Sequence, residues 1–374
     1  MIKNAILLNN NDADFYNNLG RVYFSNGNFQ AAEINYLNAI KIKSRHTKSL
    51  SNLAGLFRTI GDLDKAIEYG RLASESDPSD HEARVNLGNV LKDQKQIKSA
   101  IKEYRSAIDL KPDFALAHWN LSLALLSIGQ FEEGFEEMNW RWKWSGFPSV
   151  ERKFKEPKLS ITENLNMLTK SIKLYIYPEQ GLGDTVQFLR FGEILKGKNI
   201  FSIFECPTEL LPLLEDSHLF DQVVPQSDAL PDFDFHVSLM DLPYHCRVNV
   251  KNLPQKVPYM LPPSQITDKW FGKLKRYRGF KVGLNWQGNV LNPLEKYRSL
   301  NIEDLNSLST VRNVTWFNLQ KSSDRDNFTQ ISKLFLFNRK GPEPLVELAG
   351  LISSLDLIIT NDTAIAHLAG ALGK

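Results

Sequence analysis

The chain has 374 residues, of which 42% are hydrophobic, and lysine plus arginine outnumber aspartate plus glutamate by 45 to 43. This length exceeds one ordinary domain, and the hydrophobic content is enough to fill two or three separate cores. Because the charges nearly balance, composition gives no sign of a surface that tracks nucleic-acid phosphates, and we set nucleic-acid binding aside.

The number of cysteines and the lengths of the apolar runs indicate the cellular compartment of the protein. Cys206 and Cys246 are too few and too far apart for a disulfide framework or a metal site, which favours a reducing compartment. The apolar patch at the N-terminus is shorter than the core of a signal peptide, and no other run approaches the length of a membrane span. We therefore expect a cytoplasmic protein without a transmembrane segment.

The first third of the chain repeats with a period of 34 residues. Two series show the period, namely Leu19, Leu53, Leu87 and Leu121, and Ala5, Ala39, Ala73 and Ala107. Small residues where paired helices touch, with a glycine between the helices at Gly27, Gly61 and Gly129, are typical of the tetratricopeptide repeat. The sequence therefore predicts an α-helical solenoid over residues 1–144, and its aromatic-rich last segment, residues 131–144, is interpreted as a cap rather than a stacking site.

One asparagine recurs in the first helix of each repeat, at Asn18, Asn52, Asn86 and Asn120. A row of amides along the concave face offers donors and acceptors that can hold the backbone of an extended peptide. The alternative is that asparagine is merely tolerated at a solvent-facing position. The row resembles the asparagine ladder of the protein O-linked N-acetylglucosamine transferases, which favours peptide binding.

After a charged, irregular linker at residues 145–170, short apolar strands alternate with helices, which indicates parallel α/β architecture. A proline-rich stretch at residues 253–263 divides this part, so we predict two Rossmann-like halves, residues 171–262 and 263–374. The expected strands are 173–177, 200–205, 222–224, 235–237, 281–286, 314–319, 334–337 and 357–360, and the expected helices lie near 185–195, 208–214, 302–308, 344–353 and 363–372.

The most informative stretch is residues 171–191, SIKLYIYPEQGLGDTVQFLRF, which predicts a strand, a glycine turn and a helix start. Gly181 and Gly183 let the backbone approach a ligand, and the helix N-terminus offers N–H groups to an anion. Asp184 is placed to cap the helix or to act as a base. A dinucleotide-binding dehydrogenase is a poor alternative, because the third glycine and the ribose-binding acid of that fingerprint are absent.

Polar residues also follow the strands of the second half, where ligands bind in such sheets. The segment NWQGN follows the first of these strands, Gln320 and Lys321 follow the next, and NDTA follows the last, with His367 one turn into the helix. A diphosphate there would meet Arg298, Lys321 and a helix N-terminus. Each feature also has a structural interpretation, since an aspartate can simply cap, a histidine can pack and a lysine can be solvated.

Taken together, PEQGLGDTVQFLRF, GLNWQGN with a later YRS, NLQK, and DLIITNDTAIAHLAGALG resemble the motif series of the tetratricopeptide-containing bacterial glycosyltransferases. Their catalytic part is similar to the heptosyltransferases, glycosyltransferase family 9. The resemblance implies a GT-B fold, a nucleotide-sugar donor held mainly by the second half, no other cofactor, and metal-independent transfer with inversion. The implied acceptor is a protein or surface glycan presented by the repeats.

The resemblance also implies roles for single residues. The family's Gly-Asp turn falls on Gly183 and Asp184, which makes Asp184 the candidate general base, and no Asp-x-Asp metal motif stands at the expected strand end. The implied substrate contacts are Gln180, Gly181, Gly183, Gln187, Trp286, Gly288, Asn289, Arg298, Gln320, Lys321, Asp362, Thr363, Ala364 and His367.

The chain departs from the family at its ends, because it starts inside a repeat and stops where a relative would run on through the second sheet. We therefore expect a fragment with an incomplete second half, and hypothesise that it lacks some donor contacts and is inactive as it stands. A different class of function, a peptide-binding scaffold with a catalytically silent α/β part, remains open; it predicts no nucleotide binding.

Overall fold

The computed structural model describes residues 10–160, 164–227, 229–288, 298–300, 302–320, 335–338 and 344–374. The chain divides into two compact units, the first formed by residues 1–148 with 248–251 and the second by residues 149–247 with 252–374. Over the described ranges, none of the helices has the length and apolar character that crossing a membrane requires.

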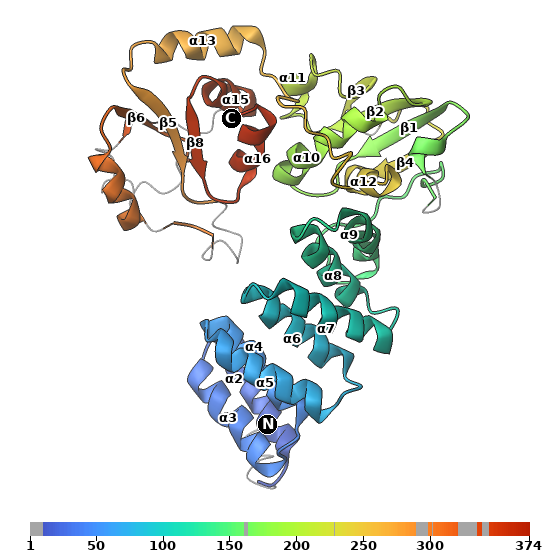
Figure 1. Cartoon of the computed structure of the whole chain (residues 1–374), viewed down its shortest axis with the longest axis vertical. Coiled ribbons are helices and arrows are strands. Elements are labelled where there is room, and N and C mark those ends of the chain that lie inside the picture. Colours follow the sequence, from blue (N-terminus) through green and yellow to red (C-terminus); the bar gives the residue numbers. More distant parts are fainter. Residues whose placement is uncertain are drawn as a thin grey trace. The chain divides into compact units, whose positions relative to one another are not determined.

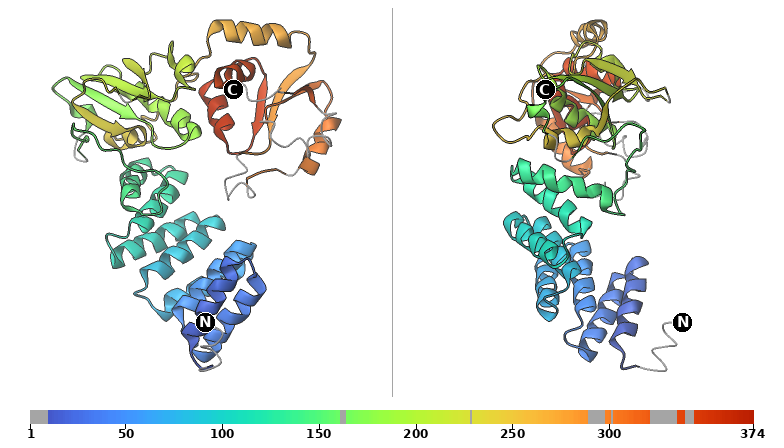
Figure 2. Two further views of the ribbon diagram at one scale, coloured as in Figure 1. Left: turned by 180° about the vertical axis from the view of Figure 1, so that it is seen from behind. Right: turned by 90° about the vertical axis from the view of Figure 1, so that its right-hand side faces the viewer.

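The first unit is a row of antiparallel helix pairs, which stack along the solenoid in every view of Figures 1 and 2. Its helices are α2 (Ala13–Ser25), α3 (Phe29–Ile42), α4 (Thr47–Ile60), α5 (Leu63–Ser76), α6 (His81–Asp93), α7 (Ile97–Leu110), α8 (Ala115–Ser127) and α9 (Phe131–Met138), followed by the 3-10 helix η1 (Asn139–Lys143). The predicted glycines Gly27, Gly61 and Gly129 form the turns within pairs and all have positive φ, which glycine tolerates best. The tetratricopeptide solenoid predicted from the period is confirmed.

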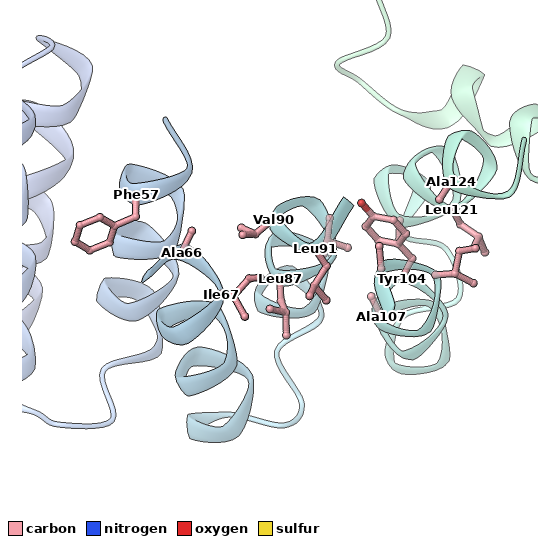
Figure 3. Close-up of a cluster of buried hydrophobic side chains, with 14 of the residues drawn as sticks. Phe57, Ala66, Ile67, Leu87, Val90, Leu91, Tyr104, Ala107, Leu121 and Ala124 are labelled. Atoms are coloured by element: carbon pink, nitrogen blue, oxygen red, sulfur yellow. The ribbon is translucent and has the colours of Figure 1, made fainter. Parts of the chain in front are cut away.

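The core of the solenoid lies between the paired helices (Figure 3). Ala66, Ala107 and Ala124 are fully buried among larger side chains. At Gly88 a Cβ would lie only 2.5 Å from Cε1 of Tyr104, a ring that is itself fully buried. The repeat therefore needs small residues at these positions because the neighbouring helix occupies the space.

The tryptophan-rich segment packs against the last repeat. Trp140 stacks on His118 with ring centroids 3.9 Å apart, and Trp144 lies against Trp119 at 6.4 Å. Arg141 is fully buried, and its Nη1 donates to the carbonyl of Met138 at 3.1 Å. This packing agrees with the interpretation of the segment as a cap.

The second unit contains two four-stranded parallel sheets with equivalent strand orders, β3-β2-β1-β4 and β7-β6-β5-β8 (Figure 1). The strands are β1 (Ile172–Tyr177), β2 (Ile200–Cys206), β3 (Gln222–Pro225), β4 (Phe235–Ser238), β5 (Phe280–Asn285), β6 (Val314–Asn318), β7 (Phe335–Asn338) and β8 (Leu357–Thr360). Every predicted strand is present with its ends within one residue of the expected ones, and the parallel α/β prediction is confirmed. The GT-B pairing of the two sheets stays a prediction.

Each sheet has a switch point, where the connections on the two sides of a central strand diverge. In the first sheet this point lies between β1 and β4, and in the second between β5 and β8. Ligands of such sheets bind outside the carboxyl ends of these strands. The helices of this unit are α10 (Leu182–Leu189) continued by η3 (Arg190–Leu195), η2 (Leu165–Met167), α11 (Leu211–Leu214), η4 (Leu239–Asp241), α12 (Leu242–His245), α13 (Ser264–Leu274), η6 (Ile302–Thr310), α15 (Leu345–Ser353) and α16 (Ala364–Ala371).

The helices depart more from expectation than the strands. The helix expected at 185–195 begins earlier, at Leu182, so that the predicted turn residues Gly183 and Asp184 lie in its first turn, and it tightens to a 3-10 helix at Arg190. Helix α13 was not predicted, and η6 is a 3-10 helix rather than an α-helix.

The segment predicted as a linker, residues 145–170, is partly built into the first sheet. Leu159 N donates to the carbonyl of His236 at 2.9 Å, and His236 N donates to the carbonyl of Pro157 at 3.1 Å. The ring of Phe154 packs against Tyr175 and Phe233. Apolar side chains within a charged segment explain this difference, since they cover the face of the sheet. The predicted boundaries at 144, 170 and 262 stay predictions.

Candidate functional site

The glycine turn after β1 and the polar turn after β8 meet where α10 packs against α16. A Cβ at Gly183 would lie 3.2 Å from Cδ2 of His367 and 3.3 Å from Cα of Ala364, so the missing side chain allows this approach. A Cβ at Gly181 would meet only Oδ2 of Asp184, at 3.9 Å. The space beside Gly181 is thus open, as expected of a ligand contact, whereas the space beside Gly183 is filled by the neighbouring helix α16.

Asp184 is a half-buried carboxyl in the first turn of α10. Burial raises the pKa of Asp184 above the ordinary range of aspartate, and the charge of Asp362 acts in the same direction. The imidazole of His367 and backbone N–H groups lower this pKa and offset part of the effect. A carboxylate whose pKa is shifted toward neutrality is better suited to take a proton from a hydroxyl.

The turn between β8 and α16, formed by residues 361–363, leads into the N-terminus of the helix. The sequence predicted that Asp362 or Thr363 caps this helix through its side chain. Thr363 is indeed the N-cap residue, but its side chain makes no capping hydrogen bond. The N–H groups of the first turn are therefore without a side-chain cap, which leaves them suited to an anion.

Three of the predicted donor contacts gather at this turn. Arg298 Nη1 donates to the carbonyl of Asp362 at 3.3 Å and lies 3.5 Å from its Oδ2. His367 Nε2 lies 4.0 Å from Oδ1 of the same residue. The Asp362 side chain is 73% exposed, so this ion pair is open to competition from a ligand anion. Asn289 and Lys321 lie outside the described residues.

Some of the substrate contacts predicted at the ends of β5 and β6 instead contact other parts of the protein. Gln320 Oε1 accepts from the N–H of Gln287 at 3.1 Å, which ties the two strand ends together. Trp286 is 4% exposed and packs in the core beside Leu284, so little of its side chain is open to a ligand. Gly288 is half-buried in this loop.

Two further predicted substrate contacts lie near the glycine turn after β1. Gln180 is half-buried in the loop before α10, and Gln187 is exposed three residues after Asp184, on the same side of the helix. Over the part of the chain described, no group of three or more His, Cys, Asp or Glu side chains is arranged to hold a metal. The expected independence of metal stays a prediction.

The structure also shows polar residues that the sequence-based site omits. Ser238, at the end of β4, is fully buried, and its hydroxyl donates to the carboxylate of Glu179, just after β1. Asn285, at the end of β5, is 2% exposed and contacts the 361–363 turn. The available signal was a polar residue ending an apolar strand, which also fits an ordinary strand boundary.

The four asparagines of the predicted peptide-binding row differ in their surroundings. Asn18 and Asn86 are exposed. Asn52 Nδ2 donates to Oδ1 of Asn17 at 2.8 Å, and Asn120, which is 8% exposed, donates from Nδ2 to Oδ1 of Asn89 at 3.1 Å. Two of the four amides therefore bridge adjacent repeats, and the role of the row in peptide binding stays a prediction.

Comparison with known proteins finds segments in both parts of the chain that match known families. Residues 13–46 match the tetratricopeptide repeat family, residues 88–129 match the TPR repeat family, and residues 316–374 match glycosyltransferase family 9 (heptosyltransferase). Protein FlbA of Caulobacter vibrioides is 23% identical over 383 residues, which cover 86% of this chain and 64% of FlbA. The chain thus spans less than two thirds of the length of this relative.

Other similarities concern the repeats. The peroxisomal targeting signal receptor of Saccharomyces cerevisiae is 36% identical over 78 residues, covering 21% of this chain and 13% of the receptor. The crystal structure of MamA is 20% identical, with a TM-score of 0.34 over 37% of this chain and 81% of MamA.

Substitution of Gly183 tests the contact between the two helices. We expect Gly183→Ala to be less stable than Gly370→Ala by about 1 kcal/mol or more, because the ring of His367 and the backbone of Ala364 must shift to admit the methyl group at Gly183. Gly370→Ala is the matched control, since nothing lies within 4 Å of a Cβ there and alanine is the better helix former. Urea denaturation followed by circular dichroism measures both; equal effects would contradict the packing role of Gly183.

Proposed function

We propose that this chain, in which tetratricopeptide repeats precede a region matching glycosyltransferase family 9, belongs to a glycosyltransferase that moves a sugar from a nucleotide-sugar donor to an acceptor presented by the repeats. One observation carries the proposal. The half-buried carboxyl of Asp184 and the α16 turn with Arg298 and His367 approach one another through the contact at Gly183. A candidate base and a candidate diphosphate site therefore adjoin.

In the proposed reaction Asp184 takes the proton of an acceptor hydroxyl while the oxygen forms a bond to the anomeric carbon. The bond between that carbon and the nucleotide diphosphate breaks in the same displacement, which inverts the configuration. Negative charge develops on the leaving diphosphate, and in this proposal the N–H groups of α16 and the guanidinium of Arg298 stabilise it. We propose Lys321 as a second cation and a GT-B arrangement of the two sheets.

The proposed acceptor is a protein or a glycan, held along the solenoid. Asn18 and Asn86 keep exposed amides, which suit the carbonyl and N–H groups of an extended peptide. The same observation supports the alternative function, a peptide-binding scaffold whose α/β part is silent. Turnover of a nucleotide sugar separates the two, because only the enzyme releases a nucleotide diphosphate.

The central test is Asp184→Asn in the full-length protein, incubated with a panel of nucleotide sugars. We expect transfer to fall by about 10²- to 10⁴-fold, the usual contribution of a general base, while affinity for the nucleotide diphosphate is kept. Diphosphate release measures transfer, and calorimetry measures binding. A chelator should leave the rate unchanged. Unaltered turnover in the variant would rule out Asp184 as the base.

The raised pKa of Asp184 also predicts the pH dependence of activity and stability. Transfer needs the ionised carboxylate, so kcat/KM should rise with pH through a pKa above the ordinary aspartate range. A raised pKa in the folded state stabilises the fold at acid pH, and this stabilisation is lost as pH rises through that pKa. Asp184→Asn should therefore melt above the wild type near neutral pH, and the gap should close in acid. A gap independent of pH would contradict the raised pKa.

The asparagine row predicts two kinds of variant. Asn18→Ala with Asn86→Ala should weaken acceptor-peptide binding with little change in melting temperature, because both side chains are exposed. Asn52→Ala or Asn120→Ala should cost about 0.5–1.5 kcal/mol of stability as well, because each breaks a hydrogen bond between repeats. Fluorescence titration with acceptor peptide and thermal melting measure the two effects. Unchanged peptide affinity in the first pair would argue against the row.

A further inference from the structure

Asn285 is an amide side chain buried at the end of an apolar strand. It is 2% exposed, and Val282 and Leu284 of the same strand are 2% and 0% exposed. A buried amide costs free energy unless its donors and acceptor find partners. An apolar residue would satisfy the sheet at lower cost, so the contacts of this amide indicate what it does.

Among the described residues, the hydrogen-bond partners of the Asn285 side-chain nitrogen all lie at the end of β8 or in the 361–363 turn. Nδ2 lies 2.8 Å from Oδ1 of Asn361, and 3.3 Å from the hydroxyl oxygens of both Thr360 and Thr363. The main chain adds one bond, from Asn361 N to the carbonyl of Asn285 at 3.3 Å. One side chain of β5 thus holds the connection that leads into α16.

The contact continues from this turn to Arg298. Asn361 Nδ2 donates to the carbonyl of Arg298 at 3.3 Å, and Arg298 Nη1 donates to the carbonyl of Asp362 at 3.3 Å. Because the Asn361 amide accepts from Asn285 and donates to Arg298, reversing it would place donor against donor and acceptor against acceptor. Its orientation is therefore fixed, and with it the approach of Arg298 to the turn.

We propose that Asn285 is a positioning residue for the donor diphosphate. It holds the 361–363 turn so that the first N–H groups of α16 and the guanidinium of Arg298 are in place before the ligand arrives. This inference rests on the proposed function. The sheet itself does not need the amide, since β5 and β8 are already joined by their parallel main-chain ladder from Val282 to Asn285. Organisation in advance of binding lowers the entropy lost when an anion is bound.

The first test compares Asn285→Leu, which has nearly the same volume and no hydrogen-bonding groups, with Thr315→Val. Thr315 is also buried in the second sheet, but its hydroxyl donates to the carbonyl of Arg278 at 2.7 Å, next to the opposite end of the sheet. Calorimetry with ADP, UDP and GDP measures affinity. We expect Asn285→Leu to bind the preferred diphosphate at least about tenfold more weakly, which is the loss of affinity expected from one or two missing hydrogen bonds. The variant should also raise KM for the donor more than it lowers kcat. Thr315→Val should keep the wild-type affinity; equal affinities of the two variants would overturn the inference.

The second test does not depend on activity. Hydrogen exchange of the amides at residues 361–367 should be faster in Asn285→Leu than in the wild type and unchanged in Thr315→Val. Unchanged exchange in Asn285→Leu would overturn the inference even if nucleotide binding changed. A full-length wild-type protein that neither binds a nucleotide diphosphate nor turns over a donor would refute the proposed function, while exchange would still decide whether Asn285 holds the turn. Asn285→Ser, smaller and polar, replaces the leucine variant should that one fail to fold, with the same expected increase in exchange.

Discussion

The candidate site depends on the close approach of α10 and α16 at Gly183. Because Gly183 has no side chain, the ring of His367 and the backbone of Ala364 can pack closely against the first turn of α10, which also contains Asp184. Burial raises the pKa of the Asp184 carboxyl, while the nearby imidazole of His367 limits the rise. Residues of α16 therefore pack against Gly183 and also act on the proton affinity of the candidate base.

The two sheets share one structural feature at their switch points. In each sheet a buried polar side chain at the end of one strand holds the connection that follows the adjacent strand. Ser238 of β4 donates to Glu179 after β1, and Asn285 of β5 donates to Asn361 after β8. A parallel sheet brings these strand ends to one edge, where main-chain pairing stops and the loops need other partners. Buried polar groups at these edges fix the loops on which the proposed chemistry depends.

Local patterns were sufficient for the repeats and the strands. The solenoid follows from a period of 34 residues, and the parallel strands follow from short apolar runs bounded by turn residues. The gathering of Arg298, Asp362 and His367 was expected from motif order, and the structure brings them together. The partner of Gly183 was not predictable, because it lies on a helix of the other sheet and nothing in the turn itself indicates a packing contact. The packing of Phe154 on the first sheet was missed for a different reason, because its charged sequence neighbours made the segment look like an exposed linker.

Burial also separates two uses of asparagine in this protein. Asn17, which is 2% exposed, accepts from Asn52 of the next repeat, as Asn361 accepts from Asn285 in the second sheet. In both places an amide joins elements distant in sequence, and its orientation is set by its partners. Asn18 and Asn86 repeat in the sequence with the same period as Asn52 but remain exposed. Equal spacing therefore does not mean equal surroundings, because the period gives only the position on the helix, and the neighbouring side chains decide whether an amide joins two repeats or stays exposed.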